Sequence, residues 1–178
     1  MNASLKKIAE SGKKLLWPKV NIAGLEIKEG SIRIAQLEDG KLKQSAIVLE
    51  PGIIDSGKVT DKKRLTESLK ALHSQFGKPN EKIPVIALAP SINVYTQVFN
   101  LPFLSKESLK EAAELNLRSI SPIDWNASYA DWQQIGEQEK EGKIELLGAF
   151  ASRAAIDEYV QALSGSGFIP VAIEFSAL

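Results

Sequence analysis

The first 18 residues place their hydrophobic positions in the rhythm of an amphipathic helix. The apolar or small residues fall on one helical face: Leu5, Ile8, Ala9, Gly12, Leu15 and Leu16. The other face collects the charged side chains of Lys6, Lys7, Glu10, Lys13 and Lys14. Asn2 or Ser4 is placed to cap this helix, and Pro18 ends it.

A short basic helix of this kind lies on an anionic membrane surface or docks on a partner, and the alternative is packing on its own domain. We treat residues 1–18 as a leader and assign its membrane- or partner-directed positions to Leu5, Ile8, Lys13, Lys14 and Trp17.

Three strands, a helix and a fourth strand are predicted over residues 20–90. The strands at 20–27, 31–37 and 42–49 are joined by short turns that contain glycine, which predicts an antiparallel meander. A helix follows over residues 62–76, with Asp61 as its N-cap. The apolar run 83–89 predicts a central parallel strand reached through a helical crossover. This β-β-β-α-β order is half of a ribonuclease-H-like unit.

The pattern restarts after Pro90 and predicts a small α+β unit. Strands are expected at 94–101, 127–135 and 143–151, with a helix that begins after Ser105 and ends before Pro122. The charged run 137–142 is predicted as a solvated hairpin loop. A second helix at 154–163 and a last strand at 168–174 complete the chain.

Composition removes most catalytic chemistry from consideration. The chain of 178 residues has a formal net charge of zero, which argues against a dedicated nucleic-acid binder. It has no cysteine, so disulfides and thiolate nucleophiles are excluded. Its single histidine, His73, is predicted to be an exposed helix residue. We therefore predict no catalytic residue and no metal site, and no enzymatic activity.

Membrane and export signals are also absent from the sequence pattern. No apolar run reaches the roughly 18–20 residues that a membrane span requires. The segment Leu15–Trp17 is too short for the apolar region of a signal peptide. We expect a cytoplasmic protein.

Several local motifs recur in the order seen in one known family. These are Gly24–Arg33, Gly52–Asp61, Ala87–Pro90, Leu101–Pro102, Ile120–Pro122 and Ala151–Glu174. In order and spacing they resemble the PilM-like proteins, which are actin-like cytoplasmic components of type IV pilus machines related to the cell-division protein FtsA. The resemblance covers residues 20–178.

The resemblance implies an α/β (α+β) fold in which a small subdomain interrupts an actin-like one. Residues 19–90 correspond to part of the ribonuclease-H-like subdomain 1A, residues 91–165 to the inserted subdomain 1C, and residues 166–178 to a strand that returns toward 1A. Family members are about twice as long, so the chain is expected to be an N-terminal part of such a protein.

Nucleotide binding is implied by the resemblance but is disfavoured by the residues. The family's phosphate-binding turn corresponds to Glu26, Lys28, Gly30 and Ser31, and it departs from the pattern because Glu26 replaces an aspartate and Lys28 a glycine. Glu29 adds a negative charge where a phosphate would lie, which is unfavourable. We predict an exposed charged turn and no cofactor in this chain, whereas a full-length protein has room for ATP and Mg²⁺.

A binding role is the function that the resemblance favours. PilM-like proteins hold the cytoplasmic tail of a PilN-like membrane protein between subdomains 1A and 1C, and other pilus platform proteins are further candidate partners. Apolar residues in turn-rich segments are the candidate groove positions, with core packing as the alternative: Ile53, Ile54, Val59, Val98, Phe99 and Phe103.

The predicted function is therefore a non-catalytic scaffold at the inner face of the cytoplasmic membrane. Two alternatives stay open. One is an actin-like ATP-binding protein, and the other is the L-type scaffold of a type II secretion system.

Overall fold

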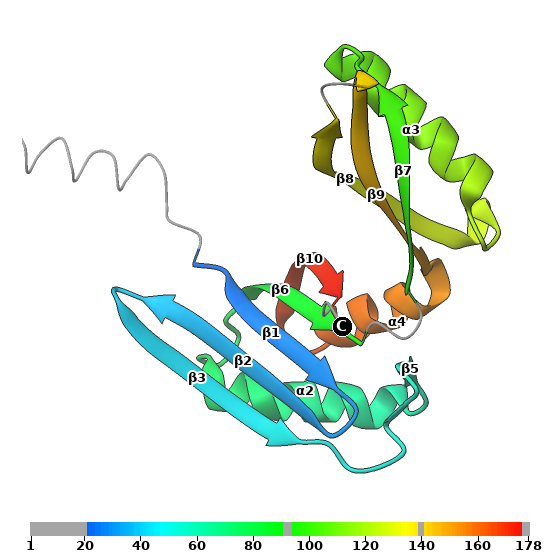
Figure 1. The fold of residues 1–178 in the computed structure, drawn as a ribbon. Helices are drawn as coiled ribbons and strands as arrows, with labels where there is room; N and C mark the ends of the chain where they lie inside the picture. Colours follow the sequence, from blue (N-terminus) through cyan, green and yellow to red (C-terminus); the bar gives the residue numbers. More distant parts are fainter. Residues whose placement is uncertain (1–20, 91–93, 139–140, 176–178) are drawn as a thin grey trace, which may run out of the picture.

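The computed structural model describes residues 21–90, 94–138 and 141–175. The predicted leader, residues 1–18, lies outside the described residues. The described chain forms two structural units, each with its own hydrophobic core, and the smaller unit is inserted into the larger one (Figure 1).

The larger unit is built on a mixed sheet of five strands in the order β10-β6-β1-β2-β3. Strands β1 (Ala23–Lys28), β2 (Ser31–Glu38) and β3 (Lys41–Val48) form the predicted antiparallel meander. Strand β6 (Ile83–Ala89) runs parallel to β1 on one side and to β10 (Phe168–Phe175) on the other. The predicted crossover to a central parallel strand is thereby confirmed.

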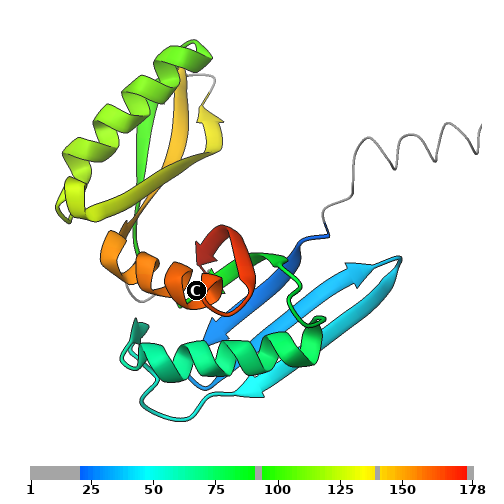
Figure 2. The same cartoon turned by 180° about the vertical axis from the view of Figure 1, so that it is seen from behind.

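Two helices lie on the same face of this sheet, as Figure 2 shows from behind. Helix α2 (Lys62–Phe76) begins at the predicted N-cap, where the Asp61 carboxylate accepts the Arg64 N–H at 2.9 Å. Helix α4 (Arg153–Ser164) packs beside α2 and buries Tyr159, Ala162 and Leu163 in the core of the larger unit. The sequence had placed this helix in the inserted unit, up to residue 165. The stripe of α4 that carries Tyr159 and Leu163 packs in the core of the larger unit.

The inserted unit is an antiparallel sheet of three strands with one helix. Strand β9 (Lys143–Ser152) lies between β7 (Val94–Pro102) and β8 (Ser128–Gln138). Helix α3 (Lys106–Ile120) covers one face and starts at Ser105, as predicted. The buried side chains between helix and sheet include Phe99, Leu117, Leu146 and Phe150.

A small hairpin precedes α2 and was not predicted. Strands β4 (Ile54–Asp55) and β5 (Lys58–Val59) are joined through Ser56 and Gly57, whose φ angles are 49° and 70°. Two successive positive φ angles are typical of a type I′ turn, which suits a two-residue hairpin. The sequence Asp55-Ser56-Gly57 carries that turn signal, but the flanking strands are too short to show alternation.

The prediction that His73 is exposed is wrong. The residue is 9% exposed, and its Nε2–H donates to the Glu81 carbonyl at 2.9 Å. The ring of Phe168 meets it edge to face at a centroid distance of 5.3 Å. A half-polar ring can be buried when its N–H finds an acceptor, and the loop after α2 supplies one.

Candidate partner-binding groove

The residues at the predicted phosphate position lie in and beside the turn between β1 and β2. Glu26 and Lys28 alternate onto the same face of β1 and form an ion pair at 2.9 Å. Gly30 and Ser31 follow at the start of β2. The Lys28 ammonium thus has a carboxylate partner within its own strand.

Glu29 holds the neighbouring hairpin at this turn. Its Oε1 accepts the Gly57 N–H at 3.2 Å, and the Gly57 carbonyl accepts the Tyr159 hydroxyl at 2.9 Å. Burial raises the pKa of Tyr159 to about 12, and the nearby carboxylates of Glu158 and Glu29 add to this rise. The turn therefore presents a carboxylate that is already used in an internal contact, and a phosphate would have to compete with it.

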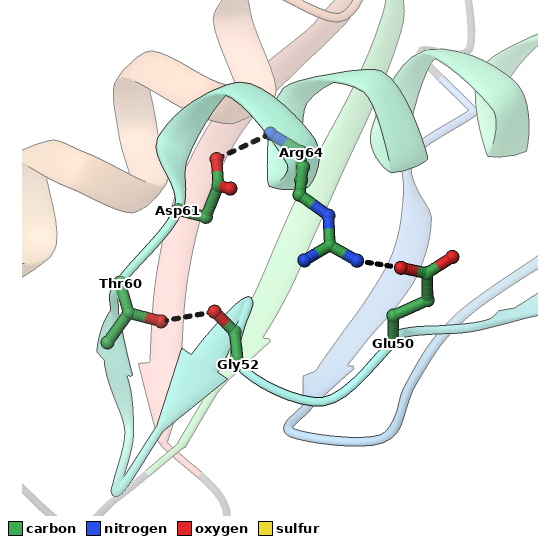
Figure 3. Close-up of polar contacts among 5 residues, drawn as sticks. All are labelled: Glu50, Gly52, Thr60, Asp61 and Arg64. Atoms are coloured by element: carbon green, nitrogen blue, oxygen red, sulfur yellow. Dashed lines mark hydrogen bonds and ion pairs between the residues drawn. The ribbon is translucent and has the colours of Figure 1, made fainter.

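The loop before α2 is fixed by polar contacts, which Figure 3 shows. The Thr60 hydroxyl donates to the Gly52 carbonyl at 2.8 Å, and Arg64 pairs with Glu50. With both ends of the loop tied to the helix start, Ile53 and Ile54 turn into the core of the larger unit. Val59 packs against the same core. These three predicted groove residues serve packing.

The other three predicted groove residues lie in the inserted unit and point in different directions. Phe99 is buried under α3, whereas Val98 alternates to the opposite face of β7 and is half exposed. Phe103 comes directly after Pro102, the last residue of β7, which lies opposite Lys143 of β9. The structure does not gather the six predicted residues into one surface.

A groove of about 440 Å³ lies between the two units. The inserted unit contributes strands β8 and β9, and the larger unit contributes α4 and β10. Its lining is mostly apolar and includes Ala149, Ala151, Ile156, Val160, Val171 and Ile173. Because β9 leads straight into α4, the chain itself holds the two walls together.

Polar side chains mark one rim of this groove. The Tyr129 hydroxyl donates to Asp157 at 3.0 Å, and the Arg153 guanidinium lies 4.3 Å from the centre of the Tyr129 ring. Arg153 also donates to the Ser128 carbonyl at 3.0 Å. Asp131 adds a further carboxylate to the lining. The rim thus combines an aromatic ring, a cation and two carboxylates.

Two sheet edges meet the groove. Among the described strands, β8 is the last of the three-stranded sheet and β10 is the last of the five-stranded sheet. An unpaired strand edge offers backbone N–H and C=O groups to an added extended segment. The groove therefore provides apolar contacts for side chains and two edges for backbone pairing.

Sequence reasoning missed this groove, although one signal was present. Helix α4 has a second apolar stripe, Ile156 and Val160 at i and i+4, beside the stripe that carries Tyr159 and Leu163. A helix with two apolar stripes contacts two partners. The sequence alone did not say that β8 and β10 would lie on either side of it.

The described residues form a mixed α/β fold in which a three-stranded antiparallel unit interrupts the unit built on the five-stranded sheet. Among solved structures, the chain is similar to one from the PilM-PilN type IV pilus biogenesis complex, with a TM-score of 0.75 and 20% sequence identity over 89% of this chain and 48% of that chain. The predicted resemblance to PilM-like proteins and the predicted fold class are confirmed at the level of the fold.

A second similar structure is the cytoplasmic domain of EpsL, an inner-membrane component of the type II secretion system of Vibrio cholerae. It aligns with a TM-score of 0.55 and 11% identity over 86% of this chain and 56% of that chain. The chain spans about half the length of these solved relatives. No protein-family model matches it, and no curated protein matches it in sequence.

Proposed function

We propose that the chain is a scaffold unit of a pilus-type assembly platform, which binds the cytoplasmic tail of a PilN-like inner-membrane protein in the groove between its two units. The observation that carries this proposal is the apolar groove bounded by the edges of β8 and β10. The solved structure of similar fold is itself a PilM-PilN complex, which supports a partner of that kind.

The groove chemistry suits an extended peptide with apolar side chains. A strand placed between β8 and β10 sends alternate side chains to opposite sides, so one set meets Val160 and Val171 while the other faces solvent or the rim. Asp131 and Asp157 favour a basic residue at the rim over an acidic one.

We propose a non-catalytic role that requires no nucleotide in this chain. Glu29 places a carboxylate at the phosphate position, and Lys28 is paired with Glu26. A bound phosphate would have to break the Glu29 contact and would then meet its charge. Titration of a longer protein that contains this unit with ATP and Mg²⁺ tests whether the whole protein binds nucleotide.

The second candidate function is a scaffold of a type II secretion system, since the EpsL domain shares the fold. We prefer the pilus role, because the chain aligns with the structure from the PilM-PilN complex at a higher TM-score than with the EpsL domain, over a similar share of the chain. Either role places the protein at the cytoplasmic face of the inner membrane. Within the described residues, no helix is long and apolar enough to span a membrane.

A peptide titration tests the proposal. N-terminal peptides of PilN-like proteins encoded near this chain are titrated by calorimetry or fluorescence anisotropy. Val171→Asp puts a charge on the groove wall and should weaken binding at least about tenfold, because an unpaired carboxylate is costly in an apolar contact.

Val48→Asp is the matched control, since Val48 is an exposed strand valine on β3, away from the groove lining. Equal binding of the two variants, or no binding to the parent chain tighter than about 1 mM, would contradict the proposal.

A further inference from the structure

The backbone of β8 turns alternate residues toward the free edge of its sheet, and the strand register shows which ones. The Phe103 N–H donates to the Gly142 carbonyl at 3.1 Å, so Gly142 turns its backbone groups toward β7. Orientation alternates along an antiparallel ladder, and Gly148, an even number of residues further along the chain, therefore also points to β7. Its neighbour on β8, Trp132, is left with its N–H and C=O at the free edge. Ala130 has the same orientation by alternation.

The free edge of β8 is guarded by a carboxylate. The Trp132 N–H donates to Oδ1 of Asp131 at 2.8 Å, which agrees with an amide that is turned away from β9. Charged side chains commonly protect strand edges from unwanted pairing. A strand that adds to β8 therefore has to take this N–H over from the Asp131 carboxylate.

Of the two strand edges at the groove, β8 offers the more regular ladder. Its pairing with β9 is continuous from Ser128 to Gln134. The register of β10 shifts between Pro170 and Ala172, within the part that lines the groove, and Pro170 has no N–H to donate. An extended segment in the groove therefore finds its backbone partners on β8.

Hollows lie on both faces of this edge. The groove between the two units reaches Ala130 and Asp131 from the side of α4 and β10. A second hollow of about 400 Å³, called the α3 pocket below, reaches the same two residues from the side of α3. Its other lining residues are two tryptophans and three side chains of α3: Trp125, Trp132, Lys110, Glu114 and Leu117.

We propose, on the basis of the function proposed above, that the partner tail adds to β8 as a further strand and directs its side chains alternately into the groove and into the α3 pocket. Asp131 lies beside Ala149, which lines the groove, so a tail residue next to Asp131 faces the groove. The tail residues before and after it face the α3 pocket. A carbonyl of the tail replaces the Asp131 carboxylate at the Trp132 N–H.

The two hollows define the chemistry of the tail. Once it is released from the Trp132 amide, the Asp131 carboxylate favours a lysine or arginine beside it. The α3 pocket favours large apolar side chains, because Trp125 and Trp132 are part of its lining. The ligand class is thus an extended segment with a basic residue beside Asp131 and large apolar residues on either side of that position.

A backbone N-methyl scan of the tail peptide tests the strand addition. The full chain is titrated with the PilN-like tail peptide that binds it and with copies that are methylated at one amide each. Methylation removes a donor and blocks close approach, so the affinity should fall at least about tenfold at every second residue and much less at the residues between. A parent peptide that binds while its methylated copies show no period of two overturns the strand addition and leaves the proposed function intact. No binding of the parent peptide contradicts the proposed function itself.

Amide exchange tests the transfer of the Trp132 N–H. Binding of the same peptide should slow hydrogen exchange at Ala130 and Trp132 at least about tenfold, because both amides enter the new ladder. Val98 supplies the matched control, since its amide lies on the opposite edge of the same sheet, on β7, and should not change. Equal slowing at all three amides, or none at Trp132, overturns the strand addition.

Photo-cross-linking locates the side chains of the tail. A benzophenone amino acid is placed at successive positions of the peptide, and the cross-linked segments of the full chain are identified by mass spectrometry. Neighbouring positions should alternate between α3, around Lys110 and Glu114, and α4, around Ile156 and Val160. Cross-links to α4 from every position would show a tail that lies in the groove without pairing with β8, and the strand addition would then be wrong.

Discussion

The Tyr159 hydroxyl donates a hydrogen bond at 2.9 Å to the carbonyl oxygen of Gly57, a residue 102 positions earlier in the chain. This contact joins α4, which follows the inserted unit, to the β4–β5 hairpin, which precedes it. The amide of the same glycine is bound by Glu29, at 3.2 Å. The contacts of Glu29 and Tyr159 thus connect three segments beside the insertion through one residue, Gly57.

Replacing Tyr159 by phenylalanine should lower the free energy of unfolding by about 1–2 kcal/mol, because the Gly57 carbonyl loses its partner in a buried setting. Urea unfolding at neutral pH measures the change. Tyr129→Phe removes a hydrogen bond to Asp157 at the surface and should cost less than about 0.5 kcal/mol. A Tyr159→Phe chain as stable as the parent would show that the contact contributes nothing.

The same tyrosine should make the protein sensitive to alkaline pH. Its pKa is raised to about 12 in the folded chain, chiefly by burial, whereas an unfolded tyrosine titrates near 10. Above pH 10 the unfolded chain therefore loses this proton first, and the stability falls by up to about 1.4 kcal/mol per pH unit until pH about 12. Below pH 10 the contribution is complete. Comparing parent and Tyr159→Phe between pH 9 and 11 isolates this slope, and identical slopes would contradict the prediction.

The order of strands and helices was predictable because most elements carry their own periodicity and end signals. Asp61 and Ser105 mark helix starts, and the apolar run 83–89 marks an inner strand. His73 could not be placed in this way. Its burial depends on Phe168 and on the Glu81 carbonyl, and only the folded chain brings these two groups to it.

The groove was less predictable than the fold. Its walls come from β8, β9, α4 and β10, and the relation of β8 to β10 is set by the angle between the two units, which leaves no local mark in the sequence. The predicted positions Ile53 and Phe99 were chosen because they are apolar in turn-rich stretches. That criterion also selects core residues, which is what both are.

Gly167 has a conformation and a setting that no side chain fits. Its φ is +94°, and an added Cβ would lie 2.8 Å from Nε2 of His73. Gly167→Ala should therefore destabilise the chain by about 2–3 kcal/mol, from backbone strain and displacement of the buried ring. Gly40→Ala has a φ of +78° but open space around it, so it reports the backbone cost alone, about 1 kcal/mol. Thermal unfolding of both variants measures the difference, and equal losses would show that the contact with His73 is unimportant.

The cap of α2 should be measurable as a local contribution. Asp61→Ala removes the acceptor for the Arg64 N–H and should cost about 1 kcal/mol, whereas Asp61→Asn keeps an oxygen there and should cost much less. Hydrogen exchange of the first turn of α2 gives the site-specific measurement. If the two variants exchange alike, charge rather than capping is the relevant property of Asp61.

The packing of the inserted unit depends on a glycine in the middle of β9. An added Cβ at Gly148 would collide with the Leu117 side chain of α3 and crowd Phe99, so α3 could not keep its distance from the sheet. Gly148→Ala should destabilise this unit by about 1–3 kcal/mol, the usual cost of overpacking. Trp132 packs against this core, so tryptophan fluorescence reports its loss. Gly136→Ala, on the neighbouring strand, would meet chiefly the flexible end of Glu145 and should be milder.

Because β9 also lines the groove, peptide affinity should fall in Gly148→Ala together with the fluorescence transition. Unchanged affinity would show that the groove does not need this core intact.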